Sequence, residues 1–228
     1  MFPLLQLILL PFTSFLLDIG GTNPNAASNT DYVPDEGIGA TFITTFMPKS
    51  GKIILWSMTF YQGLYLFLQA FSPSLISVLF PQLPPFSDPL PWTSSIVLGY
   101  ILISVGGLGR LWCYRTLGRF FTYQITIRQS HKLIQTGPYA HVRHPSYTFV
   151  IILVAGILLV HRRLANFFPH NEWIQMIFSP VGALISWIII IFFITRRVIR
   201  EEEELKKKFG KEWTQYASET KRFIPCLF

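Results

Sequence analysis

The stretch TGPYAHVRHPSY, residues 136–147, decides the fold, because it leads from a polar segment straight into an apolar one. The uncharged run FVIILVAGILLV, residues 149–160, follows it and has the hydropathy of a helix in lipid. Pro145 suits the first turn of that helix, so Arg143 and His144 are predicted to cap it at the membrane edge. Groups of this kind form either an interfacial anchor or a functional site. Both interpretations stay open at this point.

Composition sets the class of protein. Half of the 228 residues are hydrophobic and only 14% are charged, whereas a soluble domain carries roughly 25% charged residues. We therefore predict an all-α integral membrane protein. The net charge of +7 is attributed to cytosolic faces beside anionic membrane lipid. No base-stacking motif accompanies it, so no nucleic-acid partner is expected.

The sequence contains about five apolar stretches that suggest membrane spans, since a span needs about 20 residues. The first lacks a basic leading region and a cleavage site, so a signal peptide is the weaker interpretation. The third and fifth contain pairs of small residues, Ser95 with Gly99 and Gly182 with Ser186, at a spacing that lets helices approach closely. The five stretches are residues 2–17, 53–80 (interrupted late by Pro73), 93–114, 147–160 and 174–195.

Charge between the spans predicts their orientation. Residues 110–144 hold six Lys/Arg and no acidic residue, and residues 196–228 hold nine Lys/Arg against six acids. The positive-inside rule places both segments in the cytosol. Arg162 and Arg163 contradict this pattern, and a shallow hairpin that does not fully cross the membrane would remove the conflict.

Two regions are predicted along the chain. Residues 1–114 would form about three transmembrane helices with a polar loop at 18–52, and residues 115–228 would form the catalytic region. The two cysteines, Cys113 and Cys226, do not indicate a disulfide framework. Cys226 also lies one residue short of a prenylation box. No Cys/His cluster has metal-ligand spacing, so no metal is expected.

A second charged segment, residues 196–225, is predicted to continue as a helix out of the fifth span. Its apolar residues form one stripe. Glu201 lies one turn after Arg197, close to the bilayer, and a carboxylate and a guanidinium placed there suggest a site. The alternatives are a solvated helix face, a positive-inside arginine, or a simple pair of charges. The stripe consists of Val198, Leu205, Phe209, Trp213 and Tyr216.

These two segments together resemble the isoprenylcysteine carboxyl methyltransferase family over residues 115–225. Part of the pattern is also found in phospholipid N-methyltransferases. Many relatives have glycine where this chain has Phe149. The matching positions are His131, Leu133, Ile134, Gly137, Tyr139, Arg143, His144, Pro145, Ser146, Tyr147, Glu201, Glu202, Phe209, Gly210, Glu212, Trp213, Tyr216, Arg222, Phe223, Ile224 and Pro225.

The resemblance implies methyl transfer from S-adenosylmethionine to the carboxylate of a C-terminal prenylcysteine, in a cytosolic pocket formed by residues 115–147 and the C-terminal helix. It implies that Arg197 holds the substrate carboxylate and that Glu201 acts beside it. It also implies an endoplasmic reticulum membrane and a prenyl chain that enters from the lipid. The residues implied to hold the cofactor are Gln124, His131, Lys132, Leu133, Ile134, Tyr139, His144, Pro145, Ser146, Tyr147 and Glu201.

The chemistry of this assignment is coherent. A carboxylate is already ionised at pH 7 and needs no general base, so catalysis depends mainly on in-line positioning. An arginine fork orients a carboxylate in a way that lysine does not reproduce. Two other functions stay open: a phospholipid N-methyltransferase and a non-catalytic lipid-binding homologue. Sterol reductases share a related membrane architecture, but the expected dinucleotide site is missing from the sequence. The oligomeric state is left open.

Overall fold

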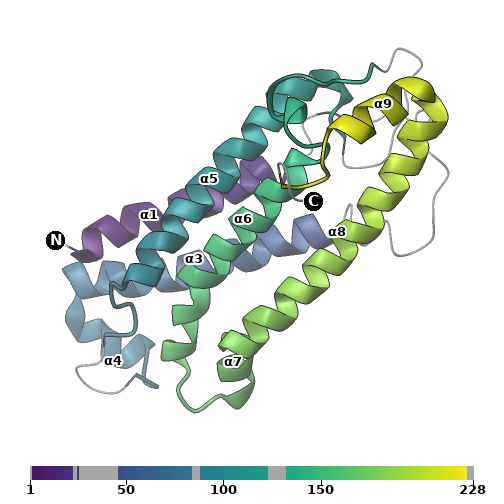
Figure 1. Ribbon diagram of the computed structural model, residues 1–228. Coiled ribbons are helices and arrows are strands. Elements are labelled where there is room, and N and C mark those ends of the chain that lie inside the picture. Colours follow the sequence, from purple (N-terminus) through teal and green to yellow (C-terminus); the bar gives the residue numbers. More distant parts are fainter. Residues whose placement is uncertain (1, 23–24, 26–45, 84–87, 123–131, 225–228) are drawn as a thin grey trace.

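The computed structural model describes residues 2–22, 25, 46–83, 88–122 and 132–224, and Figure 1 shows them as a set of helices. No strand occurs within these ranges, and one isolated bridge joins Val142 to Lys221. The prediction of an all-α membrane protein is confirmed at this level. The helices divide into an N-terminal pair, a central pair and a long C-terminal helix.

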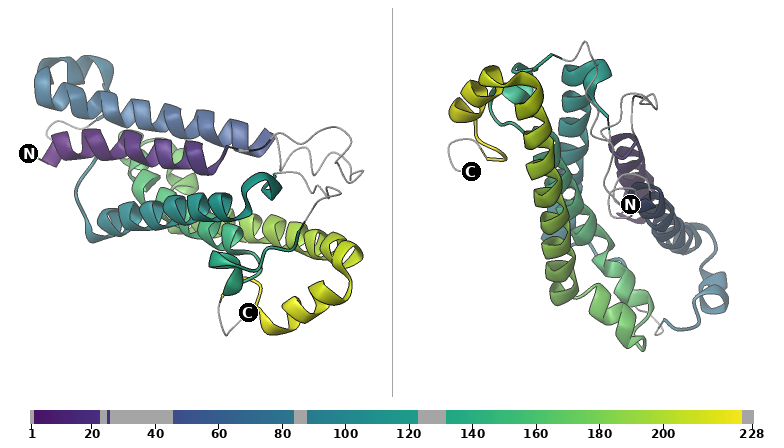
Figure 2. Two further views of the ribbon diagram at one scale, coloured as in Figure 1. Left: turned by 90° about the horizontal axis from the view of Figure 1, so that it is seen from above. Right: turned by 90° about the vertical axis from the view of Figure 1, so that its right-hand side faces the viewer.

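The N-terminal pair consists of α1 (Phe2–Gly20) and α3 (Met47–Phe71). Figure 2 shows them side by side, with α1 between α3 and α5. Their apolar faces enclose one internal polar contact, a hydrogen bond of 2.6 Å between the hydroxyls of Ser14 and Thr59. As the sequence predicts, the second apolar stretch is interrupted near Pro73. The chain continues there as η2 (Pro73–Leu75) and α4 (Ile76–Leu79).

The central pair, α5 (Ser94–Leu117) and α6 (Pro145–His161), makes the most extensive contact between helices among the described residues. Glycines make this approach possible. A Cβ on Gly106 would lie 2.6 Å from the backbone nitrogen of Leu153, and a Cβ on Gly156 would lie 2.6 Å from the Gly99 carbonyl. The close approach predicted at Gly99 is confirmed, while Ser95 instead hydrogen-bonds the Thr93 hydroxyl at 2.8 Å.

Three helical stretches within the described ranges are long and apolar enough to cross a membrane: Ser94–Phe120, Pro145–Phe167 and Pro180–Phe209. The shorter apolar stretch Leu4–Gly20 falls below that length, so the count of five spans stays a prediction. The third stretch contains α8 (Pro180–Phe209), and only 11% of its apolar window is buried inside the protein. The apolar part of α8 is therefore mostly exposed, as expected for a helix surface that contacts lipid.

The start of the predicted fifth span is wrong. Residues 172–177 form a separate short helix, α7 (Glu172–Ile177), and α8 begins at Pro180 after a tight turn. Gly182 permits this turn, because a Cβ there would overlap the carbonyl oxygen of Ile177. Gly182 therefore approaches α7 closely, rather than another long helix.

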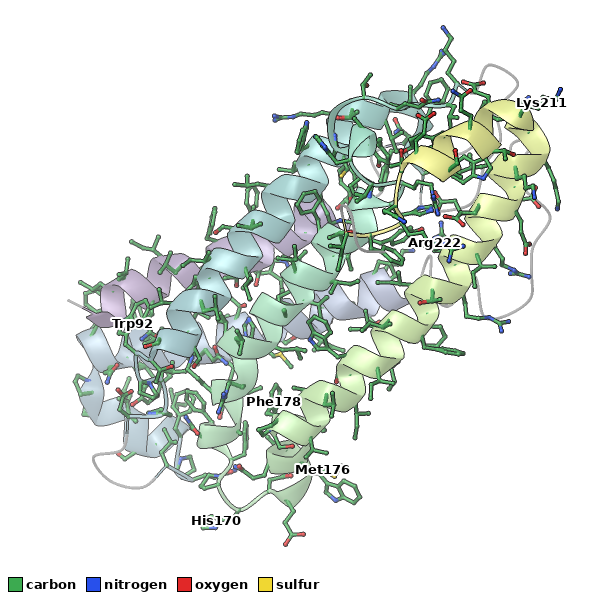
Figure 3. All side chains as sticks on the ribbon, viewed as in Figure 1. Trp92, His170, Met176, Phe178, Lys211 and Arg222 are labelled. Atoms are coloured by element: carbon green, nitrogen blue, oxygen red, sulfur yellow. The ribbon has the colours of Figure 1, made fainter. Side chains whose placement is uncertain are left out.

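The single helix predicted over residues 196–225 is also wrong. α8 ends at Phe209, and Gly210 has a φ of +56°, a conformation that favours glycine. The chain then reverses into α9 (Lys211–Glu219). Figure 3 labels Lys211 at the outer corner of this reversal and Arg222 on the returning segment.

The two arginines that contradict the charge pattern begin η5 (Arg162–Phe167). Arg163 is buried inside the bundle, where Nη1 donates to Gln6 Oε1 at 2.7 Å and Nε donates to the Val160 carbonyl at 3.1 Å. The stretch Pro145–Phe167 has the length of a full span. Burial of Arg163 therefore accommodates its charge without requiring the predicted shallow hairpin.

Candidate functional site

The site begins with the chain segment that follows α9, residues 220–224, which we call the C-terminal clasp. It lies against the entrance to α6. The Arg143 N–H donates to the Lys221 carbonyl at 2.7 Å, and the His144 N–H donates to the Arg222 carbonyl at 2.9 Å. These backbone bonds bring together two segments that are almost 80 residues apart in sequence.

Glu202 on α8 fixes this arrangement from the side. Its carboxylate accepts from Arg143 Nε at 3.0 Å, from Arg222 Nη2 at 2.8 Å and from His144 Nε2 at 3.2 Å. The Glu202 side chain is only 13% exposed, so these charge-assisted bonds are shielded from much of the solvent. Glu202 thus joins α8, the entrance to α6 and the C-terminal clasp.

The predicted capping of α6 is correct in position and wrong in chemistry. His144 is the residue directly before the helix, and Pro145 occupies its first turn. The His144 side chain makes no capping hydrogen bond, because its imidazole contacts Glu202 instead. Arg143 likewise uses Nη1 to donate to the carbonyls of Ala217 and Thr220 rather than to cap α6.

Tyr216 on α9 attaches the other side of the entrance. Its hydroxyl donates to the Tyr139 carbonyl at 2.6 Å, in η4 (Gly137–Ala140). Burial raises the pKa of Tyr216 to about 12 and also raises the pKa of Tyr139 well above its usual range. Both phenols therefore stay protonated across the physiological range.

A triplet of side chains, Arg197, Tyr147 and Glu201, occupies the space between α6 and α8. Arg197 Nε donates to the Tyr147 hydroxyl at 2.7 Å, and that hydroxyl donates to Glu201 Oε2 at 2.9 Å. His144 Nδ1 lies 4.0 Å from Glu201 Oε1. The two charges are thus linked through Tyr147, which fixes the direction of both side chains.

The triplet lines a cavity of about 370 Å³, within the range of roughly 300–1,000 Å³ that is usual for small-molecule sites. One end is polar and contains the triplet with Arg143 and His144. An apolar part of the wall lies between α6 and α8, and α1, α5 and α9 contribute further lining residues. The apolar residues of α6 and α8 include Val150, Val154, Ile190, Phe193 and Ile194. The cavity therefore suits a ligand that has a charged end and a long apolar part.

Most of the predicted site residues line this cavity, although no bound ligand tests their roles. Pro145 is the exception, since it packs in the first turn of α6 and does not line the cavity. Gln124 and His131 lie outside the described residues. The predicted residues on the cavity wall are Lys132, Leu133, Ile134, Tyr139, His144, Ser146, Tyr147, Arg197 and Glu201.

Arg110 is a cavity residue that the sequence reasoning missed. It is only 6% exposed, and its guanidinium donates to the Gly20 carbonyl at 2.6 Å and to Ser146 Oγ at 3.2 Å. Arg110 thus connects α1 with the entrance to α6. A single arginine inside the apolar stretch 93–114 is a signal for a functional position, but it was counted only as part of the positive-inside pattern.

Phe149, which stands where many relatives have glycine, does not line the cavity. Its ring packs against α5 at Gly109, where a Cβ would overlap the ring carbons. The larger residue on α6 is thus accommodated by a small residue on α5. The ring therefore does not block the cavity.

Fold and site together define a small helical membrane protein with a charged triplet at one end of an apolar cavity. The model of the isoprenylcysteine carboxyl methyltransferase family matches residues 97–176 of this chain. That match contains most of α5 and all of α6 but ends before Arg197 and Glu201. The positions of these two residues therefore rest on the geometry described above.

Curated relatives agree with this family. Protein-S-isoprenylcysteine O-methyltransferase B of Arabidopsis thaliana is 29% identical over 138 residues, which are 60% of this chain and 61% of that relative. A probable protein-S-isoprenylcysteine O-methyltransferase of Oryza sativa subsp. indica is 28% identical over 66% of this chain and 69% of its own length. Protein-S-isoprenylcysteine O-methyltransferase of Saccharomyces cerevisiae is 37% identical over 73 residues, 31% of this chain and 30% of that protein.

Proposed function

We propose that this protein transfers a methyl group from S-adenosylmethionine to the α-carboxylate of a C-terminal S-isoprenylcysteine, giving a methyl ester. Its partners would be prenylated proteins or peptides in a lipid membrane. The observation that carries the proposal is the Arg197–Tyr147–Glu201 triplet at the polar end of an otherwise apolar cavity. The similarity of residues 97–176 to the isoprenylcysteine carboxyl methyltransferase family supports the same reaction.

The residues around the cavity fit the methyl donor. Bound S-adenosylmethionine would supply an electrophilic methyl group on a sulfonium. Glu201 offers a carboxylate for its ammonium or ribose hydroxyls, and the Tyr139 and Tyr147 rings border the same space. We assign the donor to the predicted cofactor residues that line the cavity. We extend this assignment to Gln124 and His131 from the family pattern. Pro145 is included as the residue that fixes the start of α6.

Arg197 is our candidate for binding the substrate carboxylate. Its guanidinium orientation is fixed by the bond from Nε to Tyr147, and a fixed fork is what two-point recognition of a carboxylate needs. The substrate carboxylate is ionised at neutral pH, so no residue has to remove a proton from it. The task of Arg197 is then to hold one carboxylate oxygen in line with the methyl group.

The apolar wall gives the prenyl chain a place beside the charged end. Val150 and Val154 on α6 face this space together with Ile190 and Phe193 on α8. Since the apolar part of α8 is mostly exposed, a chain entering from the bilayer would meet this wall first. Excluding water here strengthens the interactions between charged groups at the reacting atoms.

The proposed location is the endoplasmic reticulum membrane, with the cavity facing the cytosol. The excess of Lys/Arg in residues 110–144 and 196–228 supports the cytosolic orientation. The compartment itself rests on family resemblance. Fluorescence microscopy of the tagged chain, with selective permeabilisation of the plasma membrane, tests both statements.

The reaction is tested in membranes from cells that express this chain. They are incubated with labelled methyl donor and N-acetyl-S-farnesylcysteine, and the volatile label released by base is counted. A methyl ester releases its label as methanol, whereas a phospholipid N-methyltransferase leaves a base-stable product on nitrogen. Counts equal to those of membranes without the protein would refute the proposal and favour a non-catalytic homologue.

A further inference from the structure

A second cavity, of about 380 Å³, lies at the opposite end of the helices from the first. It is enclosed by residues 91–96, by η5 and by the turn between α7 and α8. Figure 3 labels Phe178, which lines this cavity, and Arg222, which lies toward the other end of the helices. Most of its wall is polar, unlike the wall of the first cavity. The polar residues are Thr93, Ser95, Arg162, Arg163, Asn166, Gln175 and Ser179.

Arg163 is the most buried cation on this wall, with 4% of its surface exposed. Nε and Nη1 are bonded to Val160 and Gln6, but Nη2 makes no hydrogen bond among the described residues. No carboxylate within the described ranges lies at ion-pair distance from it, although the Tyr100 hydroxyl is close enough to interact with it directly and Asp88 attracts it from farther away. A buried guanidinium without an anion is costly.

Two further features make the cavity attractive to an anion. Arg162, which is exposed and adjacent to Arg163, lines the same space. The N-terminus of α8 also faces it through Ser179 and Pro180. Pro180 has no N–H and the Gly182 N–H donates to Ser179 Oγ at 3.0 Å, so this end of α8 contributes mainly the partial positive charge of the helix dipole, which favours an anion. The cavity thus combines two arginines with the positive end of a 30-residue helix.

The surroundings point to the membrane surface as the source of the anion. Trp173 on α7 is 74% exposed, and exposed tryptophans are typical of the headgroup level. Directly beyond the cavity, Val181, Leu184 and Ile185 on α8 form an exposed apolar face. A phosphate in the cavity would therefore leave the acyl chains of its lipid along α8.

We propose that Arg162 and Arg163 bind the phosphate group of a membrane phospholipid in this second cavity. Arginine suits this role, since its planar fork can form two parallel hydrogen bonds with phosphate oxygens. The site does not depend on the proposed methyl transfer.

The test uses the purified full chain in detergent, titrated with phosphatidylglycerol, with diacylglycerol of the same chains, and with inorganic phosphate. We expect saturable binding of the phospholipid and a raised midpoint of thermal unfolding. Arg162→Gln should weaken binding about tenfold, as loss of a charge-assisted hydrogen bond does. Lys211→Gln, an exposed cation at the other end, is the matched control and should bind like the wild type.

Arg163→Gln should weaken binding further. If that variant does not fold, Arg162→Gln still tests the site, because Arg162 is exposed. Equal affinity of wild type and Arg162→Gln would overturn the site. Diacylglycerol binding as tightly as phosphatidylglycerol would show that the phosphate is not recognised. Inorganic phosphate binding as tightly as the lipid would assign the cavity to a free anion and overturn the lipid assignment.

Discussion

The ring of Phe149 occupies the space that a side chain on Gly109 would need. The two residues belong to α6 and α5, which make the most extensive helix contact in the part of the chain that the structure describes. A large residue in a position that is often glycine is therefore matched by a glycine across the interface. The ring is held against α5 and away from the cavity, so the cavity stays open for a ligand.

We expect Gly109→Ala to destabilise the protein, because the added methyl group overlaps the Phe149 ring. Overpacking of this kind costs about 1–3 kcal/mol. Thermal unfolding in detergent measures the effect. Gly63→Ala on α3 is the matched control, since a Cβ there meets no atom within 4 Å. Adding Phe149→Gly to Gly109→Ala should recover part of the loss, and a double variant no better than Gly109→Ala would contradict this pairing.

Tyr147→Phe should lower methyl transfer about 10–100-fold, since misplacing groups by about 1 Å has effects of that size. The variant keeps the ring but removes the hydroxyl that joins Arg197 to Glu201. The assay is initial rate against N-acetyl-S-farnesylcysteine concentration in membranes. Tyr61→Phe, whose ring belongs to the aromatic cluster with Phe167 and Phe168, is the control. Unchanged activity in Tyr147→Phe would remove the triplet from the mechanism.

Arg197→Ala and Glu201→Gln should each abolish the base-released label while the protein remains inserted. Arg197→Lys should not restore it, because an ammonium cannot form the same two-point contact. Glu203→Gln is the neighbouring control, as Glu203 is exposed and does not line the cavity. Retained activity in Arg197→Ala would refute the substrate assignment.

Glu202→Gln should loosen the C-terminal clasp rather than act on the chemistry directly. It weakens the bonds from Arg143, His144 and Arg222, each of a type worth about 1.5–3 kcal/mol when charged. Faster hydrogen exchange of the Arg143 and His144 amides is the readout, since these amides bond the clasp. Glu204→Gln, which affects the exposed pair with Lys207, should leave that exchange unchanged.

Alkaline pH should weaken the attachment of α9. The pKa of Tyr216 is raised to about 12, above the usual value of about 10 for tyrosine. The stability that this phenol contributes is therefore complete below about pH 10 and is lost as pH rises through about 12. Tyr216→Phe should show a shallower fall in thermal stability between these values, and an identical pH profile would argue against the bond to Tyr139.

Much of the core architecture could be predicted from local pattern. The apolar stretches, the proline break after α3 and the close approach at Gly99 all depend on residues that are near in sequence. The reversal at Gly210 was missed, because the apolar stripe on both sides continues at helical spacing and only the positive φ reveals the turn. The separate helix α7 was missed for a similar reason, since its apolar residues run into those of α8.

The sequence predicted which residues belong to the site better than it predicted the hydrogen bonds between them. The sequence placed Arg197 one turn before Glu201, but it gave no sign that Tyr147 joins them, because Tyr147 is 50 residues earlier. The role of Glu202 depends equally on a chain reversal that brings Arg222 back to α8. Arg110 contacts Gly20 across the helix bundle, and such long-range pairs cannot be read from spacing alone.

The clasp has a consequence for the order of events during biosynthesis. Glu202 is neutralised by groups that precede it and by Arg222, which is made twenty residues later. While Arg222 is still inside the ribosome, the entrance to α6 lacks both the backbone bonds from the clasp and one of the three partners of Glu202. The cavity can reach its final form only after translation has passed residue 222. A nascent chain would therefore be inserted in the membrane before its cavity is complete.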